Sequence, residues 1–228
     1  RNFGLQEAVV IPGSELDLGG VALGAAKRFP DLLDEGDVVG VAWGMTIFSM
    51  SEKITPRRID NVTIVQMVGS MESPYVFAAE SCSTNIARRL GARVANFYAP
   101  AILSSVEAAR ILKHEPVIRS QFAELDRINK AVFAVGSCEA SSHVVESGIA
   151  SLDDLQDYIA RGAVGVVCGR FIDGKGDHVI GRLDERMIGI APDALRGLTV
   201  GMLVSNGFEK VAGMRAAMLG GYVTHLVT

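Results

Sequence analysis

A lysine stands at the start of an apolar helical segment near the end of the chain, where contact with an anion is expected. The stretch "VGMLVSNGFEKVAGMRAAMLGG" runs from an apolar strand through a short polar turn into a helix that begins near Lys210. The first turn of a helix has unpartnered N–H groups and partial positive charge, which disfavours a lysine there. An anion bound between the amine and the helix would satisfy both, so the position predicts an anion site. The alternative is an ordinary surface lysine.

Four apolar segments end in a glycine beside a hydroxyl or amide side chain. Each is short, is followed by a helical pattern, and predicts a strand, a turn and a helix. The four turns contain Gly44 with Thr46, Gly69 with Ser70, Gly136 with Ser137, and Ser205-Asn206-Gly207. In an open parallel sheet such turns gather at the carboxyl ends of the strands, where ligands bind. We expect a pocket for a phosphate or a polyol there, although a plain tight turn explains any single unit.

The elements that position these turns predict an α/β fold. Strands that are apolar throughout and alternate with helices are typical of a mostly parallel sheet with helices on both faces. The strand at 38–42 is the clearest, and residues 170–181 predict another strand with a glycine turn or a hairpin. Helices are expected at Gly19 to Leu33, Thr84 to Leu90, Val106 to Lys113, Val117 to Arg127, Leu152 to Arg161 and Val211 to Leu219. The chain shows no linker, so 1–228 is expected to form one domain.

Two further segments hold candidate binding residues. In "CGRFIDGKG", Arg170 and Asp173 follow a valine-rich strand. An arginine can bind phosphate and an aspartate can accept from sugar hydroxyls, while an ion pair within the loop is the alternative. Asn85 follows the second strand end and can face the same crevice, whereas Arg88 and Arg89 are expected on a solvated helix face.

The composition argues against several classes of protein. With 22 basic and 26 acidic residues and a net charge of −4, the chain has no reserve of positive charge for a nucleic-acid backbone, so DNA contact requires another segment. No apolar run approaches the roughly 20 residues that span a membrane. Cys82, Cys138 and Cys168 have no C-x-x-C spacing, and we expect a reduced, cytoplasmic protein.

Motifs for metals and cofactors are not found in the sequence. The four histidines have no metal-ligand spacing, and neither glycine-rich nucleotide motif occurs, so we expect no metal and no cofactor. Cys138 and His143 are five residues apart, but a buried cysteine at a strand end is favoured over a nucleophile.

The order of six motifs resembles the sugar-binding domain of SorC-type bacterial transcriptional regulators. They are "GDVVGVAWGMT", "NIARRLGARVANFYAPAI", "AVFAVGS", "SGIASLDDLQDYIARGAVGVVCGRFIDGKG", "RMIGIAPDALRGL" and "GFEKVAGMRAAMLGGYVTHLVT". The resemblance covers almost the whole chain and implies a Rossmann-like domain akin to phosphosugar isomerases, glucosamine-phosphate deaminase and coenzyme A transferases. It also implies an N-terminal helix-turn-helix that binds an operator, a segment expected to be absent from 1–228. The sugar-binding domain is expected to form the oligomer, a homodimer or homotetramer.

The resemblance implies ligand contacts at residues that the strand-end pattern also selects. They are Gly44, Thr46, Gly69, Ser70, Gly136, Ser137, Arg170, Asp173 and Lys210. Two positions depart from the family pattern: Val166 stands where many members have an acidic residue, and Asn206-Gly207 replaces paired glycines. The first departure removes a carboxylate that could bind sugar hydroxyls, so the identity of the effector cannot be inferred from that of a relative.

The sequence therefore predicts a non-enzymatic domain that binds a phosphorylated sugar or polyol, with Lys210 and its helix on the phosphate. Binding would favour one subunit arrangement over another and so modulate DNA binding. A neutral sugar that leaves Lys210 paired with an acid is one alternative. Another is a phosphosugar isomerase, deaminase or lyase, with Lys210 as electrophile or Schiff-base former and Asp173 or Glu139 as acid or base. No compact acid/histidine dyad near the strand ends supports the enzyme.

Overall fold

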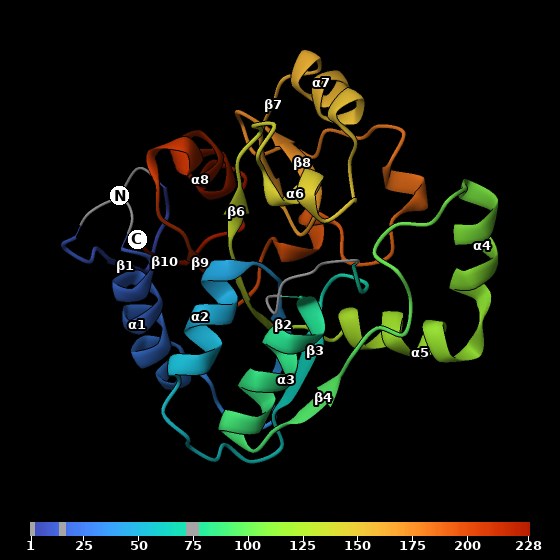
Figure 1. Cartoon of the computed structure of the whole chain (residues 1–228). Helices are drawn as coiled ribbons and strands as arrows, with labels where there is room; N and C mark the ends of the chain where they lie inside the picture. Colours follow the sequence, from blue (N-terminus) through green and yellow to red (C-terminus); the bar gives the residue numbers. More distant parts are fainter. Residues whose placement is uncertain (1–2, 14–16, 72–77) are drawn as a thin grey trace.

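A seven-stranded parallel sheet forms the centre of the computed structural model, which describes residues 3–13, 17–71 and 78–228 (Figure 1). The strand order is β1-β10-β9-β5-β2-β3-β4, and all six neighbouring pairs are parallel. The strands are β1 (Glu7–Val9), β2 (Val38–Val41), β3 (Thr63–Gln66), β4 (Arg93–Ala95), β5 (Lys130–Phe133), β9 (Val200–Val204) and β10 (His225–Val227). The predicted mostly parallel α/β fold is confirmed.

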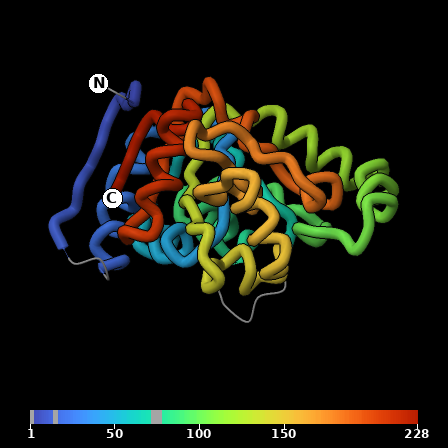
Figure 2. The backbone as a smooth tube through the Cα atoms, turned by 90° about the horizontal axis from the view of Figure 1, so that it is seen from above, coloured from blue at the N-terminus to red at the C-terminus, as the bar shows by residue number. Residues whose placement is uncertain are grey.

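The chain builds this sheet outward from its middle in two directions. From β2 it adds β3 and β4 toward one edge, and from β5 it adds β9 and β10 toward the other, where β1 completes the sheet. Figure 2 shows the first and last segments of the chain side by side at that edge. The strand order reverses between β2 and β5, which pair through Val39 and Lys130. In open α/β sheets ligands bind beyond the carboxyl ends of the strands at such a reversal.

Helices α1 (Leu18–Arg28), α2 (Met45–Lys53) and α3 (Ala79–Leu90) cover one face of the sheet (Figure 1). Successive strand residues point to opposite faces, so Val39 and Val41 pack with these helices while Val38 joins the opposite core. The helix predicted from 19 to 33 is divided into α1 and the 3-10 turn η1 (Phe29–Leu32). Pro30 lies in the first turn of η1, where its missing N–H ends the α-helical hydrogen bonding.

The opposite face packs against α5 (Pro116–Leu125) and a second sheet that the sequence did not predict. This sheet contains β6 (Val135–Gly136), β7 (Ala163–Val167) and β8 (Arg170–Asp173), and its pairs are antiparallel. The strand predicted to run to Gly136 is therefore wrong in its second half: β5 ends at Phe133, and the next residues change sheets. A tight turn at Cys168 and Gly169, both with positive φ, joins β7 to β8 as a hairpin.

Helix α8 (Val211–Leu219) packs directly on the second sheet and agrees with the predicted range. Gly165 on β7 faces Gly213 on α8 so closely that a Cβ added to Gly165 would lie 2.7 Å from the Gly213 Cα. The start of α8, and with it Lys210, is thereby held against β6 and β7.

The remaining helical elements lie between these layers and at the periphery. They are α4 (Val106–His114), α6 (His143–Glu146), α7 (Leu152–Ala160), η2 (Asp184–Arg186), η3 (Pro192–Leu195) and η4 (Phe208–Lys210). The helices predicted over 106–113, 117–127 and 152–161 are confirmed to within two residues, whereas α3 begins five residues earlier than predicted. Among the described residues, no helix has the length and apolar character needed to cross a membrane.

Candidate functional site

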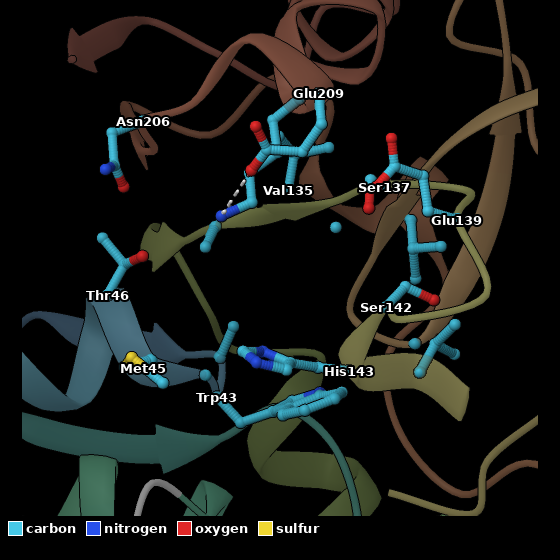
Figure 3. A pocket seen from close by; sticks show the side chains of 18 of the residues that line it. Trp43, Met45, Thr46, Val135, Ser137, Glu139, Ser142, His143, Asn206 and Glu209 are labelled. Atoms are coloured by element: carbon cyan, nitrogen blue, oxygen red, sulfur yellow. Dashed lines mark ion pairs between the residues drawn. The ribbon is translucent and has the colours of Figure 1, made fainter. Parts of the chain in front are cut away.

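A cleft of about 450 Å³ lies beyond the carboxyl ends of β2, β5 and β9, at the point where the strand order reverses (Figure 3). Its main walls are residues 42–46 after β2, 134–137 after β5, and the segment around Asn206 to Lys210 after β9. Residues between 139 and 144 and the end of the β7–β8 hairpin close it on one side. A cleft of this size suits a small organic ligand.

The first wall is the N-terminus of α2. Gly44 is the N-cap residue with a φ of 118°, a conformation that favours glycine. Gly44 itself has no side chain that could cap this helix end, which favours the N–H groups of the first turn as contacts for a ligand. The buried Thr46 lies in that turn, and Figure 3 shows its hydroxyl pointing into the cleft.

The second wall comes from the segment that changes sheets after β5. Gly136 pairs with Val166 on β7, which leaves the buried Ser137 and the carboxylate of Glu139 along the cleft. His143 follows on α6 and projects into the cleft on the same side as Trp43 (Figure 3). This wall therefore offers hydroxyl, carboxylate and imidazole groups.

The third wall carries Lys210, which is the last residue of the short turn η4 and the N-cap residue of α8. Its side chain is 25% exposed, and its Nζ lies 3.7 Å from Oε1 of Glu209. Gly207 caps η4 with a φ of 100°. The lysine thus stands at a helix start as predicted, with a carboxylate beside it that the sequence did not single out.

The titrating groups of the cleft differ in what they can do. Burial lowers the pKa of His143; Glu146, 3.7 Å from its Nε2, acts in the opposite direction, and Lys210 lowers the pKa further. Burial raises the pKa of Cys138 to about 11 and that of Cys168 to about 12, so both thiols are protonated near neutral pH and are poor nucleophiles. In residues 3–13, 17–71 and 78–228, no group of three or more His, Cys, Asp or Glu side chains could hold a metal ion.

The structure brings half of the predicted binding residues together in this cleft. They are Gly44, Thr46, Gly136, Ser137 and Lys210. Asn85 does not line it: the residue lies on α3, where its amide donates to Ser51 Oγ at 3.3 Å and accepts from Arg88.

Gly69 and Ser70 also lie outside the cleft lining, although they follow β3 as predicted. The N–H of Gly69 donates to the carbonyl of Ile188, and that of Ser70 donates to the carbonyl of Ala99. A Cβ on Gly69 would lie 2.6 Å from the Pro100 carbonyl oxygen. Close backbone packing therefore accounts for this glycine, and we do not carry the pair into the proposed site.

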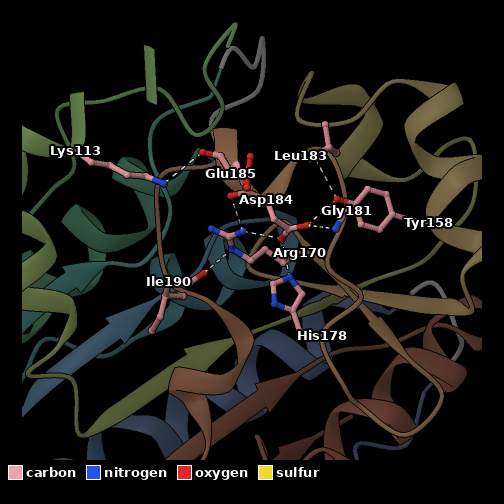
Figure 4. Close-up of polar contacts among 9 residues, drawn as sticks. All are labelled: Lys113, Tyr158, Arg170, His178, Gly181, Leu183, Asp184, Glu185 and Ile190. Atoms are coloured by element: carbon pink, nitrogen blue, oxygen red, sulfur yellow. Dashed lines mark hydrogen bonds and ion pairs between the residues drawn. The ribbon is translucent and has the colours of Figure 1, made fainter. Parts of the chain in front are cut away.

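Arg170 (Figure 4) and Asp173 have structural partners instead of positions in the cleft. The buried Arg170 donates to Asp184 Oδ1 at 2.7 Å and to the carbonyl of Ile190 at 3.1 Å. The carboxylate of Asp173 accepts from the backbone N–H of Lys175 and Asp177, which fixes the glycine turn after β8. These contacts assign both residues to the fold, so we do not include them in the proposed site.

Several cleft residues were not selected from the sequence as binding residues. They are Trp43, Glu139, His143, Asn206 and Glu209. Asn206 lies within a selected turn, whereas Trp43 precedes Gly44 and Glu209 precedes Lys210, so including the sequence neighbours of these selected residues would have found both. Glu139 was considered only as the acid or base of an enzyme and His143 only beside Cys138, because their approach to the cleft depends on the unpredicted second sheet.

Relatives of known name match nearly the entire chain. The family model "Sugar-bind: Putative sugar-binding domain" matches residues 1–228. The chain is 36% identical over 234 residues to the "Uncharacterized transcriptional regulator YjhU" of Escherichia coli K12, covering 99% of this chain and 71% of the relative. It is 31% identical over 237 residues to the transcriptional regulator LsrR of the same strain, covering 100% of this chain and 72% of LsrR.

Solved structures show the same architecture. The full-length sorbitol operon regulator SorC of Klebsiella pneumoniae matches with a TM-score of 0.91 at 26% identity, over 100% of this chain and 75% of SorC. A DeoR family transcriptional regulator of Listeria monocytogenes also has a TM-score of 0.91, at 22% identity over 99% of this chain and 91% of the relative, and this likeness concerns the fold alone. The chain therefore belongs to the family of sugar-binding domains of SorC-type transcriptional regulators.

Proposed function

We propose that the cleft is the effector site of this regulator domain and that it binds a phosphorylated sugar or polyol. The observation that carries the proposal is the position of Lys210 in the same cleft as the N-terminus of α2, where the N-cap residue is Gly44. Helix N–H groups and a lysine amine together favour a phosphate group through the helix dipole and charge-assisted hydrogen bonds.

The rest of the cleft is suited to the sugar or polyol portion of such a ligand. Thr46 and Ser137 supply hydroxyl groups that both donate and accept, as sugar hydroxyls require. Trp43 supplies an aromatic surface at the floor of the cleft (Figure 3). We therefore assign the phosphate to Lys210 and the N–H groups at the start of α2, and the hydroxyl-bearing carbons to the hydroxyl groups of Thr46 and Ser137 and the ring of Trp43.

The regulatory step in our proposal is a change in subunit arrangement within a cytoplasmic homodimer or homotetramer. The named relatives are transcriptional regulators, and the net charge of −4 makes residues 1–228 a poor surface for DNA. Contact with operator DNA is thus assigned to a segment outside 1–228. Binding acts on DNA affinity only if the ligand prefers one arrangement of the subunits.

Phosphorus NMR on pentose, hexose and polyol phosphates, each mixed with the purified chain, tests the proposal. We expect one class of ligand to show a broadened or shifted resonance with no new species over time. New resonances that grow with time would contradict the proposed sensor and indicate an enzyme. Unchanged spectra for the whole panel would contradict a phosphorylated effector and direct the search to neutral sugars.

A further inference from the structure

A carboxylate occupies the part of the cleft that is assigned to the phosphate. Glu209 Oε1 lies 3.7 Å from Lys210 Nζ, and the dashed line in Figure 3 marks this ion pair. The two side chains are 39% and 25% exposed, so both remain within reach of a ligand. In the free domain, the lysine charge is already partly neutralised by its neighbour in sequence.

The same carboxylate also lies over the glycine that starts the helical turn. A Cβ added to Gly207 would clash with both carboxylate oxygens, and that glycine caps η4 with a φ of 100°. Acidic side chains are favoured at the start of a helix because of the partial positive charge there. Glu209 therefore occupies the Lys210 amine, which is the group in this wall that would attract a ligand anion.

We propose that Glu209 is an internal competitor that determines which anions the cleft retains. A ligand phosphate must displace the carboxylate from Lys210 and from the turn at Gly207, and this inference rests on the proposed function. The free-energy cost of this displacement lowers the affinity of every phosphorylated ligand by the same factor. Inorganic phosphate, which gains nothing further, is thereby kept out at ordinary concentrations, whereas a sugar phosphate recovers affinity through contacts such as those with Thr46 and Ser137.

The cleft offers a matched control for this role. Glu139 is a second carboxylate in the lining, and no ion pair joins it to another residue in the described parts of the chain. Removing its charge changes the cleft charge by the same amount as removing that of Glu209, without releasing Lys210. A specific effect of Glu209 is therefore separable from a general change in potential.

The test is a titration of inorganic phosphate followed by phosphorus NMR, with the unchanged chain, E209Q and E139Q. We expect E209Q to lower the Kd for phosphate about tenfold and E139Q to lower it about twofold at most. E209A serves as a second variant, and thermal melting of each protein verifies that it is folded. Equal Kd values for the unchanged chain and E209Q, or equal gains in E209Q and E139Q, would overturn the competitor role.

Failure of this inference is distinguishable from failure of the proposed function. If a sugar phosphate binds the unchanged chain and loses affinity in Lys210→Ala, while E209Q shows no gain, only the role of Glu209 is refuted. If neither inorganic phosphate nor any sugar phosphate binds the unchanged chain or E209Q, both proposals fall. In the double variant K210A/E209Q, we expect most of the tenfold gain in phosphate affinity to disappear. The amine for which carboxylate and phosphate compete is then absent.

Discussion

The cleft and the buried cluster around Asp184 contain similar residue types but use them in opposite ways. Asp184 accepts hydrogen bonds from Tyr158 at 2.7 Å and from the Gly181 N–H at 2.8 Å, and it contacts Arg170 and His178 at 2.7 Å each (Figure 4). In the cleft, the ion pair of Lys210 is longer and partly exposed. The cluster satisfies its charges within the protein, whereas the cleft leaves groups for a ligand.

Burial explains why the two arrangements differ. The side chains of Arg170 and Asp184 are 8% and 9% exposed, and the donors around Asp184 hold its pKa well below the ordinary value despite burial. Unpaired charges at such depth would be costly, so the cluster has to be complete. Because Arg170 begins β8, the cluster also anchors the second sheet, whose strands β6 and β7 form part of the cleft wall.

The largest expected effect is the loss of stability when the cluster is broken. Replacing Asp184 by alanine leaves the guanidinium of Arg170 buried without its carboxylate, and we expect the free energy of unfolding to fall by about 3–5 kcal/mol. Urea denaturation followed by circular dichroism measures this change. Glu107→Ala, which removes the exposed partner of Arg110, is the control and should cause no measurable loss. A similar small change for both variants would contradict the anchoring role.

The cleft should give the opposite pattern when its charge is removed. In Lys210→Ala we expect the affinity for a phosphorylated ligand to fall by roughly 1.5–3 kcal/mol, because a charge-assisted contact is lost, while thermal stability changes little. Calorimetry with the sugar phosphate identified by NMR measures the affinity. Arg215→Ala removes the same charge from an exposed position on α8 and should bind normally. If both variants bind equally well, Lys210 does not contact the phosphate.

The contact between α8 and the second sheet links the two regions and should show an intermediate effect. Alanine at Gly165 places its Cβ 2.7 Å from the Gly213 Cα, where backbone must move, so we expect a loss of about 1–3 kcal/mol in stability. The displaced α8 should also weaken ligand binding. Gly174→Ala, with no atom within 4 Å of the added Cβ, is the matched control. Urea denaturation measures the stability of both variants, and calorimetry measures their ligand affinity. A Gly165→Ala variant as stable as Gly174→Ala would contradict the importance of the close contact between α8 and β7.

The main sheet could be predicted because its strands carry their own signal. The run Val38–Val41 is buried on both faces, and such strands are continuously apolar in sequence. The second sheet could not be predicted because Val135 follows β5 after the single residue Ala134, and neither glycine nor proline marks the change of sheet. Local periodicity describes a strand but does not state which sheet it joins.

The candidate site was predictable only to the extent that strand ends determine it. Gly44 and Gly136 follow neighbouring parallel strands, whose carboxyl ends must meet, so their proximity follows from the topology. Arg170 also had a suitable residue type, yet its partner Asp184 is 14 residues away and is reached only through a folded loop. Residue type indicates the chemistry that is available, whereas burial decides whether that chemistry is used for a ligand or for the fold.

The smallest expected effect is a change in the pH dependence of ligand binding. It concerns His143, a titrating group of the cleft, and not the charges of the Asp184 cluster. His143 lines the cleft, and in the free domain burial and Lys210 lower its pKa against the influence of Glu146. A phosphate bound at Lys210 offsets the charge that lowers the pKa of His143, so that pKa rises and the complex holds more protons than the free domain. The additional affinity is then fully present below the pKa of the free state and is lost as the pH rises through that of the complex.

Phosphate itself titrates in the same range, so the informative quantity is the ratio of affinities between the unchanged chain and His143→Gln. We expect that ratio to rise roughly three- to tenfold between pH 8 and pH 6, measured by calorimetry with one sugar phosphate. The ligand's own protonation is common to both proteins and cancels in the ratio. A ratio that stays constant over this range would show that the bound phosphate leaves the effect of Lys210 on His143 unchanged, and it would contradict the placement of the phosphate beside Lys210.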